Sequence, residues 1–130
     1  MTEDELPPQP GGELALKTVA LPRDTNAHGD ISAGWLVSQM DLAAEITAAN
    51  LAKGRVVTVA IEELAFMRPI AIGASVNCHT EILEIGRSSM RILVEVWTCL
   101  PGPPEPYKIT EGEFVLVALD DEGRARRVVV

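Results

Sequence analysis

Apolar residues recur at helical spacing in one segment of the chain and at alternate positions in several others. The helical segment begins near Ser32 or Ala33 and reaches about Asn50. Lys53-Gly54 marks its end, because glycine commonly follows the last turn of a helix. Little charge precedes Asp41 in this segment, which predicts a largely buried helix. Its periodic apolar positions are Leu36, Val37, Met40, Ala43, Ala44 and Ile46.

Alternation of apolar and polar residues predicts strands on both sides of this helix, with glycine, proline or aspartate in the turns. The pair Gly86-Arg87 is typical of a hairpin. The expected strands are Leu14 to Leu21, Arg55 to Met67, Ser75 to Ile85, Ser88 to Thr98, Glu113 to Leu119 and Arg126 to Val130. A lone buried helix needs cover on most of its circumference. We therefore expect an α+β fold in which an antiparallel sheet of about five to six strands wraps around one long central helix.

Length and composition fit a single domain. The chain has 130 residues, of which 47% are hydrophobic and 23% charged, as in ordinary soluble globular proteins. Prolines and glycines behind an acidic cluster predict a disordered tail over residues 1–13, which leaves residues 14–130 as the domain. Neither a membrane span nor a signal peptide is apparent, so we expect a cytoplasmic protein. The net charge of -8 argues against a nucleic-acid partner, because affinity for phosphate backbones needs clustered Lys and Arg.

The two cysteines, Cys78 and Cys99, each lie in an alternating apolar segment. Neither has a second cysteine at the spacing of a zinc site. We interpret them as free core thiols, rather than as a disulfide or as ligands of a metal.

The start of the helix carries the most informative chemistry. A polar loop that contains glycine, Thr25 to Asp30, leads directly into the helix, whose first amides have no partner within it. The amides of Ala33 and Gly34 can stabilise a developing oxyanion, and Asp41 can activate a water or act directly as the nucleophile. Together these groups predict hydrolysis. Two structural interpretations stay open: Ala33-Gly34 permits tight packing against a strand, and Asp41 forms a solvent-facing stripe with Glu45.

Several blocks of the sequence follow one another in an order that is typical of a known family. They are Asp24 to Asp30 with Gly34-Trp35, Ser38 to Asp41, Gly54 to Val59, Phe66 to Pro69 and Glu95 to Trp97. From about Leu14 to Val128 the chain resembles the acyl-CoA thioester hydrolases of the hotdog superfamily, in particular the bacterial cytosolic enzymes related to brain-type acyl-CoA hydrolase. The resemblance implies a hotdog fold and hydrolysis of acyl-CoA to free acid and CoA, without metal or organic cofactor. It also implies a homodimer as the catalytic unit, with further assembly into a tetramer or a hexamer of dimers left open.

The resemblance also implies roles for residues of the loop. The motif of the family carries an amide or a carboxylate there, which assigns Asn26 and Asp30 to positioning of substrate or water. The same residue types ordinarily form caps and Asx-turns, so both interpretations stay open. Asp30 and Asp41 lie roughly 16 Å apart at helical rise. A site that used both, or that used the Ala33-Gly34 amides together with Asp41, would therefore take them from opposite protomers.

CoA carries several phosphates, which an acidic protein has to meet with local basic residues. Arginine and hydroxyl side chains are suited to this task, although each arginine alone is equally typical of an ordinary surface. The candidate contacts are Arg68 before Pro69 and the turn residues Arg87, Ser88 and Ser89, with Arg91 close behind. Thr58 is expected on a strand beside the central helix, where its hydroxyl could hold substrate, and threonine is also an ordinary strand residue.

Two other activities remain as alternatives. A non-catalytic hotdog protein would bind acyl-CoA as a carrier or regulator without turnover. A hotdog dehydratase or hydratase would convert a 3-hydroxyacyl thioester and would depend on the loop histidine, His28. The His-Phe-Pro-Gly pattern of such dehydratases is missing from this chain.

Overall fold

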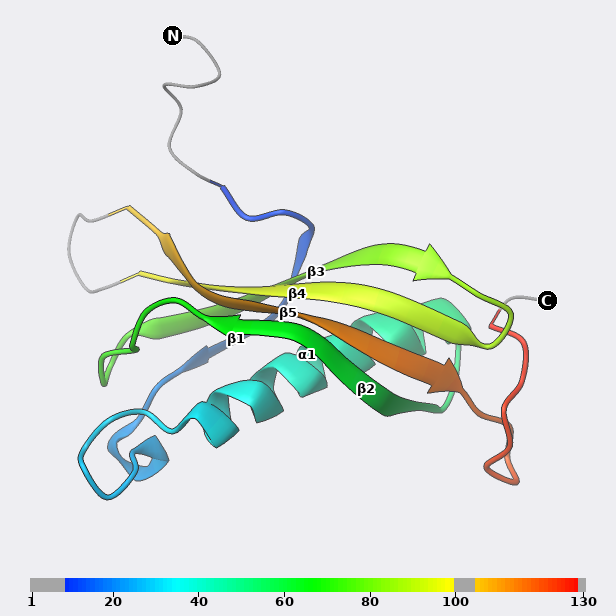
Figure 1. Ribbon diagram of the computed structural model, residues 1–130, viewed down its shortest axis with the longest axis horizontal. Helices are drawn as coiled ribbons and strands as arrows, with labels where there is room; N and C mark the ends of the chain where they lie inside the picture. The colour runs from blue at the N-terminus through cyan, green and yellow to red at the C-terminus, as the bar shows by residue number, and fades with distance from the viewer. Residues whose placement is uncertain (1–8, 100–104, 129–130) are drawn as a thin grey trace, which may run out of the picture.

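A curved sheet wraps one long helix in the computed structural model, which describes residues 9–99 and 105–128 (Figure 1). Within these residues the helix, α1, spans Ala33–Ala52, and a short 3-10 helix, η2, spans Pro22–Asp24. The five strands are β1 (Glu13–Val19), β2 (Val56–Phe66), β3 (Ser75–Ile85), β4 (Ser89–Thr98) and β5 (Tyr107–Ala118). They pair in the order β1-β3-β4-β5-β2, and every pair is antiparallel. The predicted α+β arrangement is confirmed.

The bounds of the helix follow from its capping residues. Ser32 has an extended backbone, and its hydroxyl accepts a hydrogen bond from the amide of Trp35 at 3.4 Å, so the helix begins at Ala33 as predicted. At the other end Lys53 adopts the left-handed conformation with a φ of 53°, and the amide of Gly54 bonds to Ala49. The helix therefore ends two residues beyond the expected Asn50.

The core lies between α1 and the concave face of the sheet, and α1 contacts all five strands. Small side chains on the buried face of the helix let it approach the sheet closely. The buried residues of the helix are Leu36, Met40, Ala43, Ala44, Ala48 and Ala52. Phe114 and Leu116 of β5 are fully buried opposite them. Cys78 is a buried free thiol whose burial raises its pKa to about 12, and Cys99 is a half-buried free thiol.

Two strand predictions need correction. The fifth strand begins at Tyr107, before the expected Glu113, because pairing with β4 carries it through polar residues and through Gly112. A side chain at Gly112 would lie 2.9 Å from Leu64 of β2, so glycine is needed there for close strand packing. The expected last strand, 126–130, does not form over its described residues 126–128. Val128 instead packs into the core, and its amide bonds to Arg87.

Buried and outward-facing residues alternate along β5, so substitutions at neighbouring positions test which face of the sheet forms the core. Leu116→Ala should lower the free energy of unfolding by about 2 to 5 kcal/mol, because it leaves a cavity beneath α1. Val117→Ala, on the neighbouring outward-facing position, should cost below about 1 kcal/mol. Urea unfolding of both variants measures the difference, and equal losses would contradict the assignment of the concave face as the core.

Candidate active site

Two unpaired amides mark the start of α1. Ser32 satisfies the amide of Trp35 with its side chain and that of Leu36 with its carbonyl. Within the described residues the amides of Ala33 and Gly34 have no hydrogen-bond acceptor, and both residues are exposed. Ala33, which Gly34 follows directly, lies in the wall of a hollow of 330 Å³, together with residues 31–32, Leu36 and residues 66–70. These amides can therefore donate hydrogen bonds to a negatively charged group of a ligand in the hollow.

Asp41 lies two turns further along the same helix, about 12 Å from the first helical residue. Its carboxylate accepts a hydrogen bond of 2.5 Å from the hydroxyl of Thr58 on β2. Both side chains are half-buried, so Asp41 is neither on a fully solvated stripe nor in the core. Both residues are site candidates in the sequence, but their contact is not visible there, because the register of β2 against α1 depends on packing across the whole sheet.

The loop before the helix is held by Asn26. Its side-chain oxygen accepts hydrogen bonds from the amides of His28 at 2.9 Å and Asp30 at 3.2 Å, which is the Asx-turn that sequence analysis left open. The carbonyl of Asp30 accepts a further bond from the amide of Asn26. The side chains of His28 and Asp30 are exposed, and among the described residues neither has a hydrogen-bond partner. The nitrogen of the Asn26 amide group is likewise unpaired there, so it remains available to a ligand.

The candidate phosphate contacts lie at opposite ends of the helix within one protomer. Arg68 follows β2 at the end where the helix starts, and its guanidinium stacks over the ring of Tyr107 at 5.0 Å. Arg87 and Ser88 lie in the turn between β3 and β4 and Ser89 opens β4, at the end where the helix stops (Figure 1). A single protomer therefore does not bring Arg68 and the turn together.

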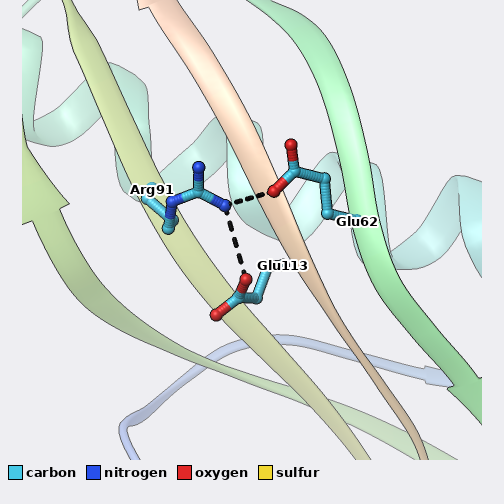
Figure 2. Close-up of polar contacts among 3 residues, drawn as sticks. All are labelled: Glu62, Arg91 and Glu113. Atoms are coloured by element: carbon cyan, nitrogen blue, oxygen red, sulfur yellow. Dashed lines mark hydrogen bonds and ion pairs between the residues drawn. The ribbon is translucent and has the colours of Figure 1, made fainter.

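Arg91 is occupied by two carboxylates on the outer face of the sheet, away from α1. Figure 2 shows its guanidinium between Glu62 of β2 at 2.5 Å and Glu113 of β5 at 3.4 Å. The hydrogen bond that Arg91 donates to the carboxylate of Glu62 raises the pKa of Arg91, and the charges of Glu62 and Glu113 act in the same direction. Arg91 therefore ties three strands together, and it does not join Arg87 as a free phosphate donor.

Glu45 lies one turn beyond Asp41 and is half-buried. Burial raises the pKa of Glu45, and the neighbouring charge of Asp41 raises it further. The spacing of four residues was visible in the sequence, but the partial burial of Glu45 depends on how α1 sits in the sheet. Glu45 is thus an electrostatic neighbour of Asp41.

No group of three His, Cys, Asp or Glu side chains among the described residues could hold a metal ion. No helix in the same part of the chain has the length and apolar character needed to cross a bilayer.

A long helix wrapped by a five-stranded antiparallel sheet is the arrangement of the hotdog class. The comparison with known families agrees, because residues 28–99 match the thioesterase superfamily. The chain belongs to this superfamily, and the resemblance found in its sequence is confirmed.

Individual relatives cover nearly the whole chain. The acyl-CoA thioester hydrolase YciA of Escherichia coli is 46% identical, over 93% of this chain and 94% of that protein. The solved structure of a hexameric broad specificity acyl-coenzyme A thioesterase is 47% identical, covers 93% of this chain and 84% of its own, and superposes with a TM-score of 0.87. A hexameric thioesterase from Yersinia pestis is 45% identical over 92% of this chain and 97% of its own, also with a TM-score of 0.87.

The raised pKa of Glu45 generates a prediction about stability and pH. Well below its ordinary value of 4.5 the side chain is protonated in both folded and unfolded protein. As the pH rises, the unfolded chain ionises first, so the folded state loses stability until Glu45 ionises there as well. Glu45→Gln should therefore stabilise the protein at neutral pH but not at about pH 3.

Chemical unfolding at both pH values measures this difference. Glu122→Gln, a change of an exposed carboxylate in the turn after β5, is the matched control and should show no such pH-dependent gain. A Glu45→Gln variant that is no more stable than the wild type at neutral pH would contradict the prediction.

Proposed function

We propose that this protein hydrolyses acyl-CoA thioesters to a free acid and CoA. The observation that carries the proposal is the pair of unpaired amides at Ala33 and Gly34 in a chain whose relatives are acyl-CoA thioester hydrolases. Water attacks the thioester carbonyl, and the resulting oxyanion accepts hydrogen bonds from these amides, each of which is worth about 2.7 to 4 kcal/mol in comparable hydrolases. Asp41 takes a proton from the water, and collapse of the intermediate expels CoA as the thiol or thiolate.

The other site residues support these steps. Thr58 holds the carboxylate of Asp41 against β2, which limits the directions from which it can approach a water. The free amide nitrogen of Asn26 and the exposed carboxylate of Asp30 position substrate or water. Arg68, and the turn residues Arg87, Ser88 and Ser89, supply the candidate contacts to phosphate. CoA is part of the substrate, no separate cofactor is needed, and the enzyme works in the cytoplasm.

The complete site is formed by a homodimer. Asp41 and the amides of Ala33 and Gly34 are about 12 Å apart on one rigid helix, too far to act on the same carbonyl. The edge strand β2 exposes a row of apolar side chains, Val57, Val59, Ile61 and Phe66, each at least 39% exposed. Such an edge is suited to pairing with a second copy.

Antiparallel pairing of β2 with its counterpart about a two-fold axis supplies the missing half of the site. In this pairing the start of β2 in one protomer, which carries Thr58, lies beside the end of β2 in the partner. That end leads to Arg68 and to the hollow at the start of the helix. Asp41 of one protomer then meets the amides of the other. Since a solved relative is hexameric, we further propose that three such dimers assemble.

Thiol release tests the activity. The wild type should release free CoA from a panel of acyl-CoA substrates, and Asp41→Ala should lower kcat by about a hundredfold to ten-thousandfold. Glu122→Gln, far from the site in sequence, should leave the rate unchanged. Absence of thiol release by the wild type would instead favour a carrier or a dehydratase, and full activity in a folded Asp41→Ala variant would remove Asp41 from the mechanism.

Subunit mixing tests the shared site. Ala33→Pro removes one amide donor at a position where helices accept proline, and Ser32 already has the extended backbone that must precede it. This variant should lose about a hundredfold or more in kcat. Mixed dimers of Ala33→Pro and Asp41→Ala carry one intact site each, so exchange of subunits should restore about a quarter of the wild-type activity. No recovery after proven exchange would show that each site belongs to one chain.

A further inference from the structure

Glu45 is a second carboxylate on the stretch of α1 that carries Asp41. The spacing of four residues places the two side chains about 5 to 6 Å apart at Cβ, on the same side of the helix. The hydrogen bond that Thr58 donates to Asp41 shows that this side of the helix faces β2, the strand that pairs with the partner in the proposed dimer. Glu45 therefore lies at the same subunit boundary as Asp41, one turn further along the helix.

The carboxylate of Glu45 is half-buried but makes no stabilising polar contact. Among residues 9–99 and 105–128 it has neither a hydrogen bond nor an ion pair. The start of β2 contributes Val56 and Thr58 to the helix side of the sheet, and neither is charged, so Asp41 is the ionised group that acts on Glu45. Burial and the charge of Asp41 raise the pKa of Glu45, so its ionised form lowers the stability of the fold. A carboxylate that costs stability without a structural contact is typical of a functional site.

The two-fold arrangement of the proposed dimer decides which part of the substrate Glu45 meets. The two helices run antiparallel, so residues that follow Asp41 along one helix extend past the start of the other helix. They extend toward the 330 Å³ hollow of the partner, whose wall contains the candidate phosphate contact Arg68. The CoA half of the substrate, and with it the thioester sulfur, is therefore on the side of Glu45, while the carbonyl carbon is on the side of Asp41.

We propose that Glu45 is the general acid that protonates the sulfur of CoA when the tetrahedral intermediate collapses. This role rests on the function proposed above. Asp41 takes a proton from the attacking water and passes it to Glu45 through a water between the two carboxylates. When the carbon-sulfur bond breaks, its electron pair stays on sulfur and the proton of Glu45 moves to that atom. The acid and the neutral thiol leave, and both carboxylates are ionised again.

Thioesters whose thiols differ in acidity test this role. A general acid matters most for a weakly acidic thiol, and least for a strongly acidic thiol that leaves unaided as the thiolate. S-benzyl and S-phenyl thioesters of one acid differ by a single methylene group, but thiophenol is far more acidic than the benzyl thiol. Glu45→Gln should lower kcat for acyl-CoA, and kcat/KM for the S-benzyl thioester, by about a hundredfold, and should leave the S-phenyl thioester nearly unaffected.

Two control variants accompany this measurement. Glu45→Asp keeps a carboxylate and should recover part of the lost rate, whereas Glu122→Gln should lose nothing. In the Glu45→Gln variant, an S-phenyl thioester that reacts no faster than the S-benzyl thioester would overturn the proposal. Thiol release from acyl-CoA at the wild-type rate in this variant would refute the role of Glu45 alone. Absence of thiol release by the wild type would refute the hydrolase itself.

Subunit mixing tests whether Glu45 acts in the same site as Asp41 of its own chain. Mixed dimers of Asp41→Ala and Glu45→Gln then contain no intact site, so exchange of subunits should restore no activity. Mixed dimers of Ala33→Pro and Glu45→Gln contain one intact site each and should recover about a quarter of the wild-type activity. Recovery in the first mixture, or none in the second after proven exchange, would overturn the placement of Glu45 beside the leaving sulfur.

Discussion

Packing of α1 into the concave face of the sheet is the constraint on which the rest of the structure depends. Four buried alanines let the helix lie close to the strands, and contact with all five strands fixes its rotation and its position. The same packing decides that Asp41 faces Thr58 on β2 and that the amides of Ala33 and Gly34 open beside the segment after β2. A helix held so firmly cannot bend to bring its own two functional ends together. The proposed two-fold arrangement follows from rigidity rather than from any special feature of the active-site side chains.

Local signals in the sequence were sufficient to predict the positions of the helix and of most strands. Ser32 caps the helix and Lys53-Gly54 ends it, and both effects act within a few residues. The start of β5 could not be found in this way. Lys108, Thr110 and Gly112 interrupt the apolar alternation. They are strand residues because β4 pairs with all three, and β2 pairs with Thr110 from the other side. The tertiary context therefore overrode local propensity.

The site shows the same division between local and distant information. Residue types pointed to Asp41, to the helix-start amides and to Thr58, but no pattern in the sequence indicates that Thr58 donates to Asp41 across 17 positions. Arg91 appeared equivalent to Arg87 in the sequence. In the fold it is neutralised by Glu62 and Glu113, which come from two other strands. Contacts between strands can be established only once their register is known.

Distribution of charge explains how an acidic protein can bind a substrate rich in phosphate. The net charge of -8 repels anions at long range, but screening confines this effect to about 10 Å at moderate salt. Binding of a phosphate therefore depends on which arginine side chains are not already paired with a nearby carboxylate. Arg91 is held by two carboxylates, whereas Arg68 rests on an aromatic ring, which orients the guanidinium without neutralising it. Aromatic support in place of a carboxylate thus keeps a positive charge available beside the helix start, even though acidic residues outnumber basic ones in the chain as a whole.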